Sequence, residues 1–153
     1  MSLEDVSQRS GATVVVSRMA IAMLSLIGLI ISAYLSLYKL GYLGFIQCTT
    51  GGCETVQSSR YAFFFGIPVA LWGVGAYLAL LVLALIGLQP GWEGKGWVGV
   101  ALFGASAVGV LFTAYLTYLE AYVIHAWCQW CLVSAALVTI IFLSSIPGLR
   151  YAR

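Results

Sequence analysis

The charged residues of this chain fall into short clusters and leave four long intervals that contain none. The first interval runs from Met19 to Tyr38, twenty residues that span roughly 30 Å as a helix, the thickness of a bilayer's hydrocarbon core. In hydrocarbon every backbone polar group needs a partner within the protein, and helices supply it. The sequence therefore predicts an all-α membrane protein, a bundle of four transmembrane helices at about 19–39, 61–88, 97–119 and 127–147.

Composition supports this fold class. Apolar residues make up 62% of the 153 residues and charged residues 8%, whereas soluble domains are about half apolar and about a quarter charged. A soluble globule is excluded, because the chain has too few polar side chains to cover its surface. Seven Lys and Arg against five Asp and Glu provide no basic surface for nucleic acid. The length predicts one integral-membrane domain over residues 1–153.

The basic residues are distributed unequally between the loops, which predicts the orientation in the membrane. With the N-terminus inside, Lys39 and Arg60 are the two external basic residues, and the reverse orientation inverts the ratio. We therefore expect a multi-pass protein of the cell inner (plasma) membrane, with both termini cytoplasmic and the loop of residues 40–60 on the external, periplasmic side. The cytoplasmic basic residues are then Arg9, Arg18, Lys95, Arg150 and Arg153.

An outer pair of cysteines, Cys48 and Cys53, lies in the loop of residues 40–60. The external side is oxidising, so disulfides form and persist there. The Cα atoms of a disulfide lie about 4.4–6.8 Å apart, whereas five steps of extended chain cover roughly 17 Å. The segment must therefore turn back on itself if the two are bonded, and Gly51 and Gly52 give it the conformational freedom to do so.

A second pair, Cys128 and Cys131, follows a short loop around residues 120–126 and lies on the same external side. The i, i+3 spacing puts both cysteines on one face of a helix. If Cys131 opens the fourth helix, the Cys128 thiolate lies near the positive N-terminal end, which lowers its pKa. A Cys-x-x-Cys pair at the start of a helix indicates redox chemistry first.

Other interpretations of the cysteines remain open. Two structural disulfides would use the same four residues, and so would a four-thiolate zinc site. A zinc site gives no reason for a place at the membrane surface beside Trp127 and Trp130, and we expect no metal. These tryptophans are interpreted as interfacial belt residues, or one of them stacks on a flat aromatic ligand.

The order of these motifs resembles the vitamin K epoxide reductase family, and is most similar to its bacterial and archaeal homologues. The resemblance covers about residues 18–149. An unrelated four-helix thiol oxidase coupled to quinone carries its Cys-x-x-Cys in the first external loop, the reverse of the order here. The motifs that carry the resemblance are Cys48-x4-Cys53, the segment Glu54-Thr55-Val56-Gln57-Ser58-Ser59-Arg60-Tyr61, Phe65-Gly66-Ile67-Pro68 and Cys128-x2-Cys131.

The resemblance implies an electron relay through the two pairs. Cys48 would exchange with a partner protein, Cys53 would pass electrons to Cys128, and Cys131 would lie beside a quinone. A short amphipathic half-helix after Cys53 would cover the site, with Ser59 as the family's serine near the active cysteines. The relay is chemically coherent, because each disulfide exchange moves two electrons and a quinone accepts two.

The resemblance also implies the ligand and its pocket. The electron acceptor would be a membrane quinone: menaquinone, ubiquinone or a vitamin K-like compound. We expect Cys131, Trp127, Trp130 and Phe65 to contribute to its pocket.

The predicted function is a quinone-coupled thiol-disulfide oxidoreductase that drives disulfide formation in exported proteins. Many bacterial members continue into a thioredoxin-like domain, so here the partner is expected to be a separate thioredoxin-fold thiol oxidase on the external side. Mammalian enzymes carry a tyrosine where this chain has Ala135, which favours disulfide formation over the alternative of vitamin K epoxide reduction. The other alternative is a non-catalytic membrane scaffold that structural disulfides hold together.

Two further polar residues, Glu120 and His125, fall near the external end of the bundle. Protons must move there when a quinone is reduced. A histidine can shuttle protons near neutral pH, and the alternative for His125 is an interfacial side chain hydrated by water.

The predicted orientation can be tested by thiol labelling. A membrane-impermeant reagent added to intact cells after mild reduction should modify Cys48, because the loop of residues 40–60 is expected outside. Labelling that requires the inner membrane to be broken would reverse the orientation, and with it the route to exported substrates.

Overall fold

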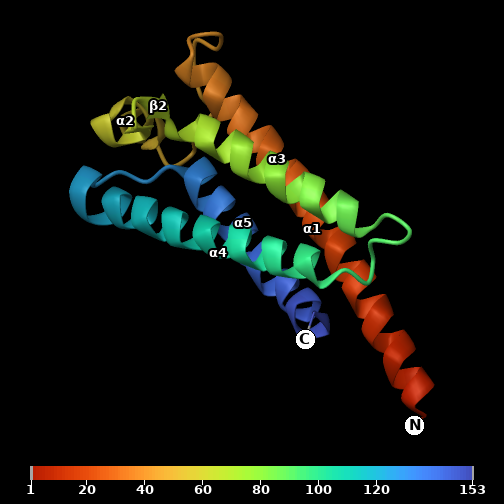
Figure 1. Ribbon diagram of the computed structural model, residues 1–153. Coiled ribbons are helices and arrows are strands. Elements are labelled where there is room, and N and C mark those ends of the chain that lie inside the picture. The colour runs from red at the N-terminus through yellow and green to blue at the C-terminus, as the bar shows by residue number, and fades with distance from the viewer. Residues whose placement is uncertain (1, 153) are drawn as a thin grey trace.

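Four long helices form a bundle in the computed structural model, which describes residues 2–152 (Figure 1). Each is long and apolar enough to cross a membrane, which confirms the predicted fold class. Helix α1 packs against α3 and α5, and α4 packs against α5 and α3. The four helices are α1 (Leu3–Lys39), α3 (Val69–Gly87), α4 (Gly96–Leu119) and α5 (Gln129–Tyr151).

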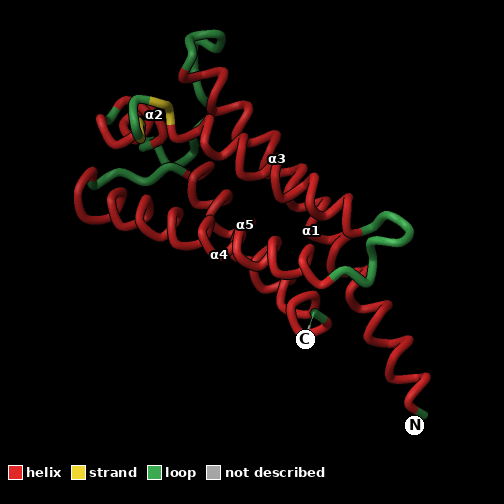
Figure 2. The backbone as a smooth tube through the Cα atoms, viewed as in Figure 1, coloured by secondary structure: helices red, strands yellow, loops and turns green. Residues whose placement is uncertain are grey.

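The loops gather at the two ends of the bundle. Both termini and the loop of residues 88–95 lie at one end (Figure 1). The opposite end carries the segment of residues 40–68, shown as loop, short helix and strand in Figure 2, together with the loop that leads into α5. Both cysteine pairs therefore lie at the same end, as the sequence predicts.

Helix α1 begins at Leu3, well before the expected start at residue 19. Ser2 caps it, since the side-chain oxygen accepts a hydrogen bond from the Asp5 amide at 3.3 Å. The polar residues before position 19 are helical as well. Hydropathy indicates only the apolar part of the helix, the part that matches the hydrocarbon core. Figure 1 shows the N-terminal part of α1 projecting beyond the other helices.

The second interval is helical over part of its expected length. Residues 61–68 instead form the end of a 3-10 turn, η1 (Arg60–Ala62), and a two-stranded hairpin of β1 (Phe63–Phe64) and β2 (Ile67–Pro68). Phe65 and Gly66 connect the strands with φ values of 53° and 75°, the left-handed conformation of a tight hairpin turn. A short apolar run does not by itself separate strand from helix, which explains the difference from the expected span of 61–88.

The third and fourth helices also differ at the end of the bundle that carries the cysteines. The expected loop around residues 120–126 is largely a π-helical turn, η2 (Glu120–Ile124), which continues α4 without a break. Helix α5 begins at Gln129, two residues later than expected, with Cys128 as its N-cap. A hydropathy pattern does not indicate a π turn, because a π turn differs from an α-helix in its backbone hydrogen bonds and not in its composition.

Two apolar clusters fill the bundle along its axis. One lies nearer the termini and includes Ile21, Leu80 and Ile141. The other lies at the loop end and contains the fully buried cysteines Cys53 and Cys128. Two of the four cysteines are therefore part of the packed interior.

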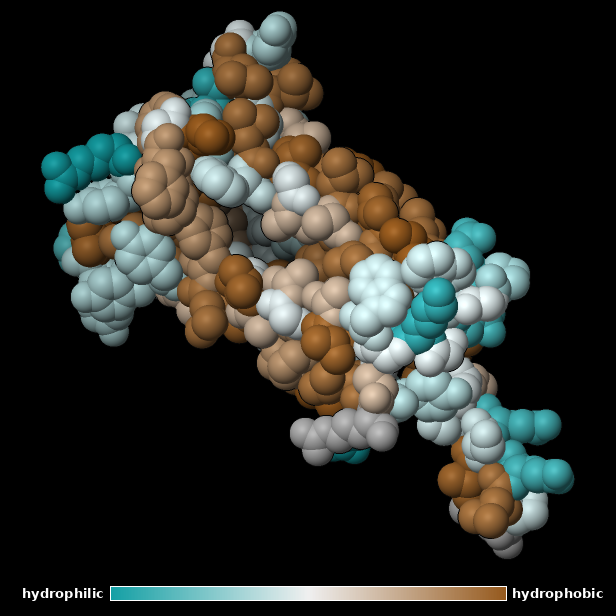
Figure 3. Space-filling view, viewed as in Figure 1, coloured by the Kyte–Doolittle hydropathy of each residue, from teal (hydrophilic) through white to brown (hydrophobic). Residues whose placement is uncertain are grey.

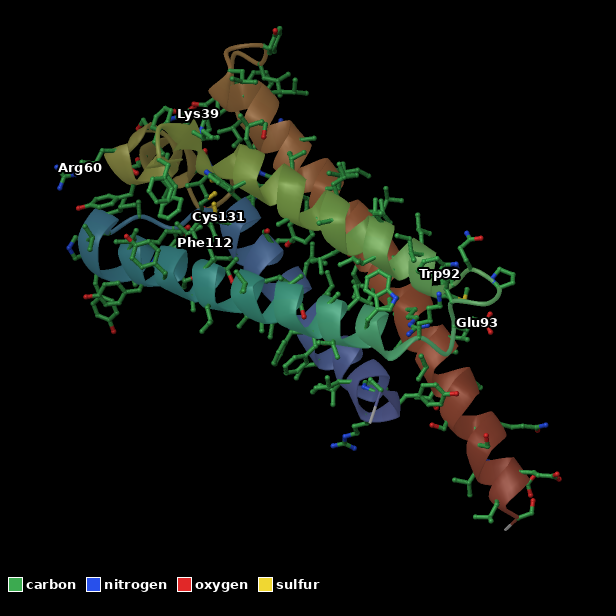
Figure 4. The ribbon with its side chains drawn as sticks, viewed as in Figure 1. Lys39, Arg60, Trp92, Glu93, Phe112 and Cys131 are labelled. Atoms are coloured by element: carbon green, nitrogen blue, oxygen red, sulfur yellow. A yellow bond between two sulfur atoms is a disulfide. The ribbon has the colours of Figure 1, made fainter. Side chains whose placement is uncertain are left out.

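Arg18 is a buried cation within α1, with 2% of its surface exposed. Its Nη1 donates to the carbonyl of Gly87, the last residue of α3, at 2.6 Å and to the carbonyl of Glu93 at 2.9 Å. The cation thus interacts with the negative end of the α3 dipole and fixes the loop after it. Figure 4 shows Glu93 on this loop, far from the cysteine end.

Replacing Arg18 should destabilise the bundle without touching the cysteines. An Arg18→Ala protein loses two hydrogen bonds from a charged donor, so the free energy of unfolding should fall by about 3 kcal/mol. Thermal unfolding in detergent measures this. Arg9→Ala, an exposed arginine of the same helix, is the control and should change stability by less than about 0.5 kcal/mol. Equal unfolding temperatures for the two variants would contradict the role of Arg18.

Candidate redox site

The outer pair is a disulfide in this structure. Cys48 and Cys53 are bonded, with Cα atoms 6.0 Å apart. Gly51 makes the turn between them with a φ of 75°, a conformation that favours glycine. Cys48 is partly exposed, whereas Cys53 is 0% exposed. The bond removes two of the four thiolates that a zinc site would need.

The inner pair consists of two free thiols at the start of α5. Cys128 is 0% exposed, and Cys131 lies one turn further along. A hydrogen bond from the Cys131 thiol lowers the pKa of the Cys128 thiol, and the backbone amides of Cys131 and Trp130 add to the effect. Those amides belong to the first turn of α5, so the predicted influence of the helix terminus is present.

Hydrogen bonds attach the outer loop to the start of α5. The backbone amide and hydroxyl of Thr49 both donate to the side-chain carbonyl oxygen of Gln129. The hydroxyl of Thr50 donates to the carbonyl of Trp127 at 2.8 Å. These contacts join segments that lie about 80 residues apart in the chain. They hold the two cysteine pairs together at the end of the bundle.

A close approach of backbones completes this docking. A Cβ atom placed on Gly52 would lie 2.5 Å from the carbonyl oxygen and 2.7 Å from the amide nitrogen of Trp127, closer than real Cβ contacts. Gly52 and Trp127 each directly precede a cysteine, Cys53 and Cys128. The absent side chain lets these cysteines enter one apolar cluster.

The predicted amphipathic half-helix is present directly after the outer pair. Helix α2 (Cys53–Ser58) buries Val56 and Gln57 and exposes Glu54, Thr55 and Ser58. The ammonium group of Lys39, at the end of α1, donates to the carbonyl of Gln57. Lys39 was expected in the external loop, and it holds the C-terminal end of α2 over the bundle.

A cavity of about 380 Å³ lies beneath α2. Its wall is mostly apolar and comes from all four long helices, α2, the hairpin and the short turns η1 and η2. Figure 3 shows this face hollowed between α3 and α4. In Figure 4, Cys131 of α5 and Phe112 of α4 lie in this region, and both line the cavity.

Of the residues expected around the ligand, the structure brings some to the cavity and not others. Cys131 and Ser59 line it, and the Ser59 hydroxyl donates to the Val56 carbonyl at 2.7 Å. Phe65 lies at the tip of the hairpin and is 85% exposed, so the neighbouring Phe64 lines the cavity instead. The hairpin explains the difference, because β1 ends at Phe64 and Phe65 lies in the left-handed turn after it.

The two tryptophans expected at the pocket lie outside its lining. Trp130 donates its indole N–H to the carbonyl of Gln47 at 2.6 Å and packs edge-on against Tyr34, so it joins the outer loop to α1 and α5. Trp127 is 46% exposed, and its backbone meets Gly52. The tryptophan that does line the cavity is Trp72 of α3.

Gln57 and Glu120 line the cavity and contact the inner pair; from the sequence, Glu120 was expected only as a residue near the site of proton movement. The side-chain amide of Gln57 donates to the sulfur of Cys131 at 3.9 Å. Glu120, the first residue of η2, is 2% exposed and accepts a hydrogen bond from the Cys128 amide at 3.2 Å. The sequence signal for Glu120 is a carboxylate eight residues before the first cysteine of the inner pair. The direction in which the Glu120 side chain points depends on the π turn and could not be predicted from the sequence.

A model of the vitamin K epoxide reductase family matches residues 19–146. The matched range begins within α1 and ends near the end of α5. It contains both cysteine pairs, α2 and the hairpin. The match confirms the resemblance found from the motifs.

The close approach at Gly52 predicts a strong effect of a small substitution. Gly52→Ala places a methyl group against the Trp127 backbone, which cannot move aside as a flexible side chain can. Overpacking of this kind costs about 1–3 kcal/mol, so thermal unfolding in detergent should occur at a lower temperature. Gly44→Ala, in the same loop with open space around it, is the matched control. Equal stability of both variants would show that the loop does not need this contact.

Proposed function

The chain belongs to the vitamin K epoxide reductase family, and we propose that it is a quinone-coupled thiol-disulfide oxidoreductase of the membrane. In this proposal it reoxidises a separate thioredoxin-fold thiol oxidase on the external side and passes the electrons to a membrane quinone. The family supports a membrane redox function. The partner and the electron acceptor are what we propose.

One observation carries the proposal, the graded burial of the four sulfur atoms. Cys48 is partly exposed, Cys53 and Cys128 are fully buried in one cluster, and Cys131 lines the cavity. A protein partner can therefore reach Cys48, and a ligand in the cavity can reach Cys131. Electrons would enter at Cys48 and leave from Cys131.

The exchange steps follow from this order. A partner thiolate attacks the Cys48 sulfur, the Cys48–Cys53 bond breaks, and Cys53 leaves as a thiolate. The second partner thiol then closes the partner's disulfide and releases Cys48. The Cys53 thiolate next attacks Cys128 in an oxidised inner pair and releases Cys131, and Cys48 closes the outer disulfide again. The inner dithiol now carries two electrons and two protons.

The cavity fits a flat apolar electron acceptor. Its volume of about 380 Å³ and its mostly apolar wall are in the range of small-molecule sites. Phe64, Trp72 and Phe112 supply aromatic surface, and Cys131 presents its sulfur to the same space. A quinone bound there would supply a two-electron acceptor. Menaquinone, ubiquinone and vitamin K-like compounds share this ring chemistry.

The free thiols favour a relay over a scaffold. A scaffold would use both pairs as crosslinks, whereas Cys128 and Cys131 are unbonded beside a cavity. Epoxide reduction receives no such support. Ala135 stands where mammalian members carry their tyrosine, and it is not among the described residues that line the cavity.

A trapped mixed disulfide tests the proposed order. The probe is a thioredoxin-fold protein with a single cysteine, preloaded as a mixed disulfide with thionitrobenzoate. The Cys48 thiolate of reduced protein should displace the coloured thiol and bind the probe, and Cys53 should then attack Cys48 and release it. In a Cys53→Ala protein the adduct should accumulate, as a band on a non-reducing gel that vanishes on reduction.

The controls separate the possible outcomes. Reduced wild-type protein should show little adduct, and a Cys48→Ala, Cys53→Ala protein should show none through this pair. An adduct that forms at Cys53 in a Cys48→Ala protein would exchange the two roles. No adduct in any variant with a competent probe would favour the scaffold.

A further inference from the structure

Glu120 is a buried carboxyl group that the electron relay does not use. It is 2% exposed and lies on η2, within a segment long and apolar enough to cross a membrane. An ionisable side chain in such a segment is costly, and where one occurs it usually faces a cavity or a partner within the bundle and serves a function. Glu120 faces both.

The side-chain hydrogen bond of Glu120 goes to the inner cysteine pair. Its Oε2 atom accepts from the Cys128 amide at 3.2 Å. Cys128 is the N-cap of α5, and Cys131 lies three residues further along. Glu120 and Cys131 line the same cavity. The carboxyl group is therefore held by the backbone of the inner pair and shares with Cys131 the space where an electron acceptor would bind.

The lining of the cavity offers the carboxylate no cation. Among residues 2–152, those that line it include no Lys, Arg or His. The titratable groups that share the cavity with Glu120 are Cys131 on α5, Tyr61 on η1 and Tyr77 on α3. An ion pair thus does not explain why this carboxyl group is buried.

The π turn sets the position of Glu120. The backbone carbonyl of Glu120 accepts a hydrogen bond from the amide of Ala126, six residues later, at 3.2 Å. In an α-helix the partner amide lies four residues later. The turn closes at His125, which has a φ of 56°. Single π turns are frequent at functional sites. Here the wide turn ends α4 and places its last inward-facing side chain against the start of α5.

We propose that Glu120 is the proton acceptor of the Cys131 thiol, and this rests on the proposed function. The S–H bond of Cys131 breaks, the proton moves to a carboxylate oxygen of Glu120, and the electron pair stays on the sulfur. When the inner pair closes to a disulfide, two electrons pass to the quinone. Glu120 hands its proton to a quinone oxygen and returns to the carboxylate, and the Cys128 thiol supplies the second proton by the same route.

A purely structural role would also explain one contact, the hydrogen bond from the Cys128 amide. The substitution Glu120→Gln separates the two roles. Glutamine keeps an oxygen that can accept from that amide, but its amide group cannot accept a proton from the thiol. Glu120→Asp keeps the carboxyl group on a shorter side chain.

The test measures Cys131 directly and needs no quinone. The protein carries Cys48→Ser and Cys53→Ser, is fully reduced in detergent, and reacts with N-ethylmaleimide over a pH series. Mass spectrometry follows alkylation of Cys131. Glu120→Gln should slow the reaction at neutral pH by roughly 100-fold and steepen its rise with pH, because general-base assistance is lost. Glu120→Asp should restore part of the rate.

The matched control is Glu54→Gln, an exposed glutamate of α2 at the same end of the bundle. It removes the same charge and should leave the alkylation rate within about twofold of the parent. Equal rates for the Glu120→Gln protein and its parent would overturn the proposal. If wild-type protein still reduced quinone, the proposed function would stand without it.

Infrared difference spectroscopy provides a measurement on the unaltered chain, which decides the matter if Glu120→Gln fails to fold. Oxidation of the inner pair should change the band of a protonated carboxyl group. A spectrum without any carboxyl change would overturn the proposal. A failure of wild-type protein to reduce any quinone, with normal infrared and alkylation results, would instead count against the proposed acceptor.

Discussion

The docking of the outer loop on the first turn of α5 is the contact on which the rest of the site depends. At Gly52 the backbone of the loop meets the backbone of Trp127 with no side chain between them. Thr49 and Thr50 fix the register of this contact with hydrogen bonds to Gln129 and Trp127. Two cysteine pairs that are distant in the sequence thereby share one apolar cluster, and α2 comes to lie over the cavity.

The same contact separates two environments for sulfur. On its outer side Cys48 remains partly exposed, while Cys53 and Cys128 on its inner side are excluded from solvent. Thiolates are costly without solvent or hydrogen bonds. The amides of the first turn of α5 and the Cys131 thiol stabilise the charge on Cys128, which lowers its pKa. In the proposed relay, burial would protect the exchange between Cys53 and Cys128 from solvent, and the first turn of α5 would keep the Cys128 thiol reactive.

The sequence predicts the four membrane spans and both cysteine pairs, because charge-free intervals and cysteine spacing are local properties. It does not predict the hairpin at residues 63–68, since a short apolar run is equally compatible with strand and helix. The expectation for Phe65 fails for the same reason. Phe64 ends the first strand and lines the cavity, whereas Phe65 lies in the hairpin turn and is exposed.

Glu120 shows a second limit of sequence analysis. Its place near the inner cysteines can be read from the chain, but the direction of its side chain follows from the π turn that ends α4. The turn and the left-handed residue after it have no composition signal. Contacts between distant segments, rather than propensity, determine the geometry of this end of the bundle.

The hollow between α3 and α4 has a consequence for how any apolar ligand would arrive (Figure 3). In a bilayer this face of the bundle borders the lipid chains, so the ligand would enter by diffusion within the plane of the membrane. Its concentration in water would then be irrelevant to occupancy. The governing quantity would be its mole fraction among the lipids, and the same amount of ligand would saturate the protein in a lipid-poor preparation and leave it nearly empty in a lipid-rich one.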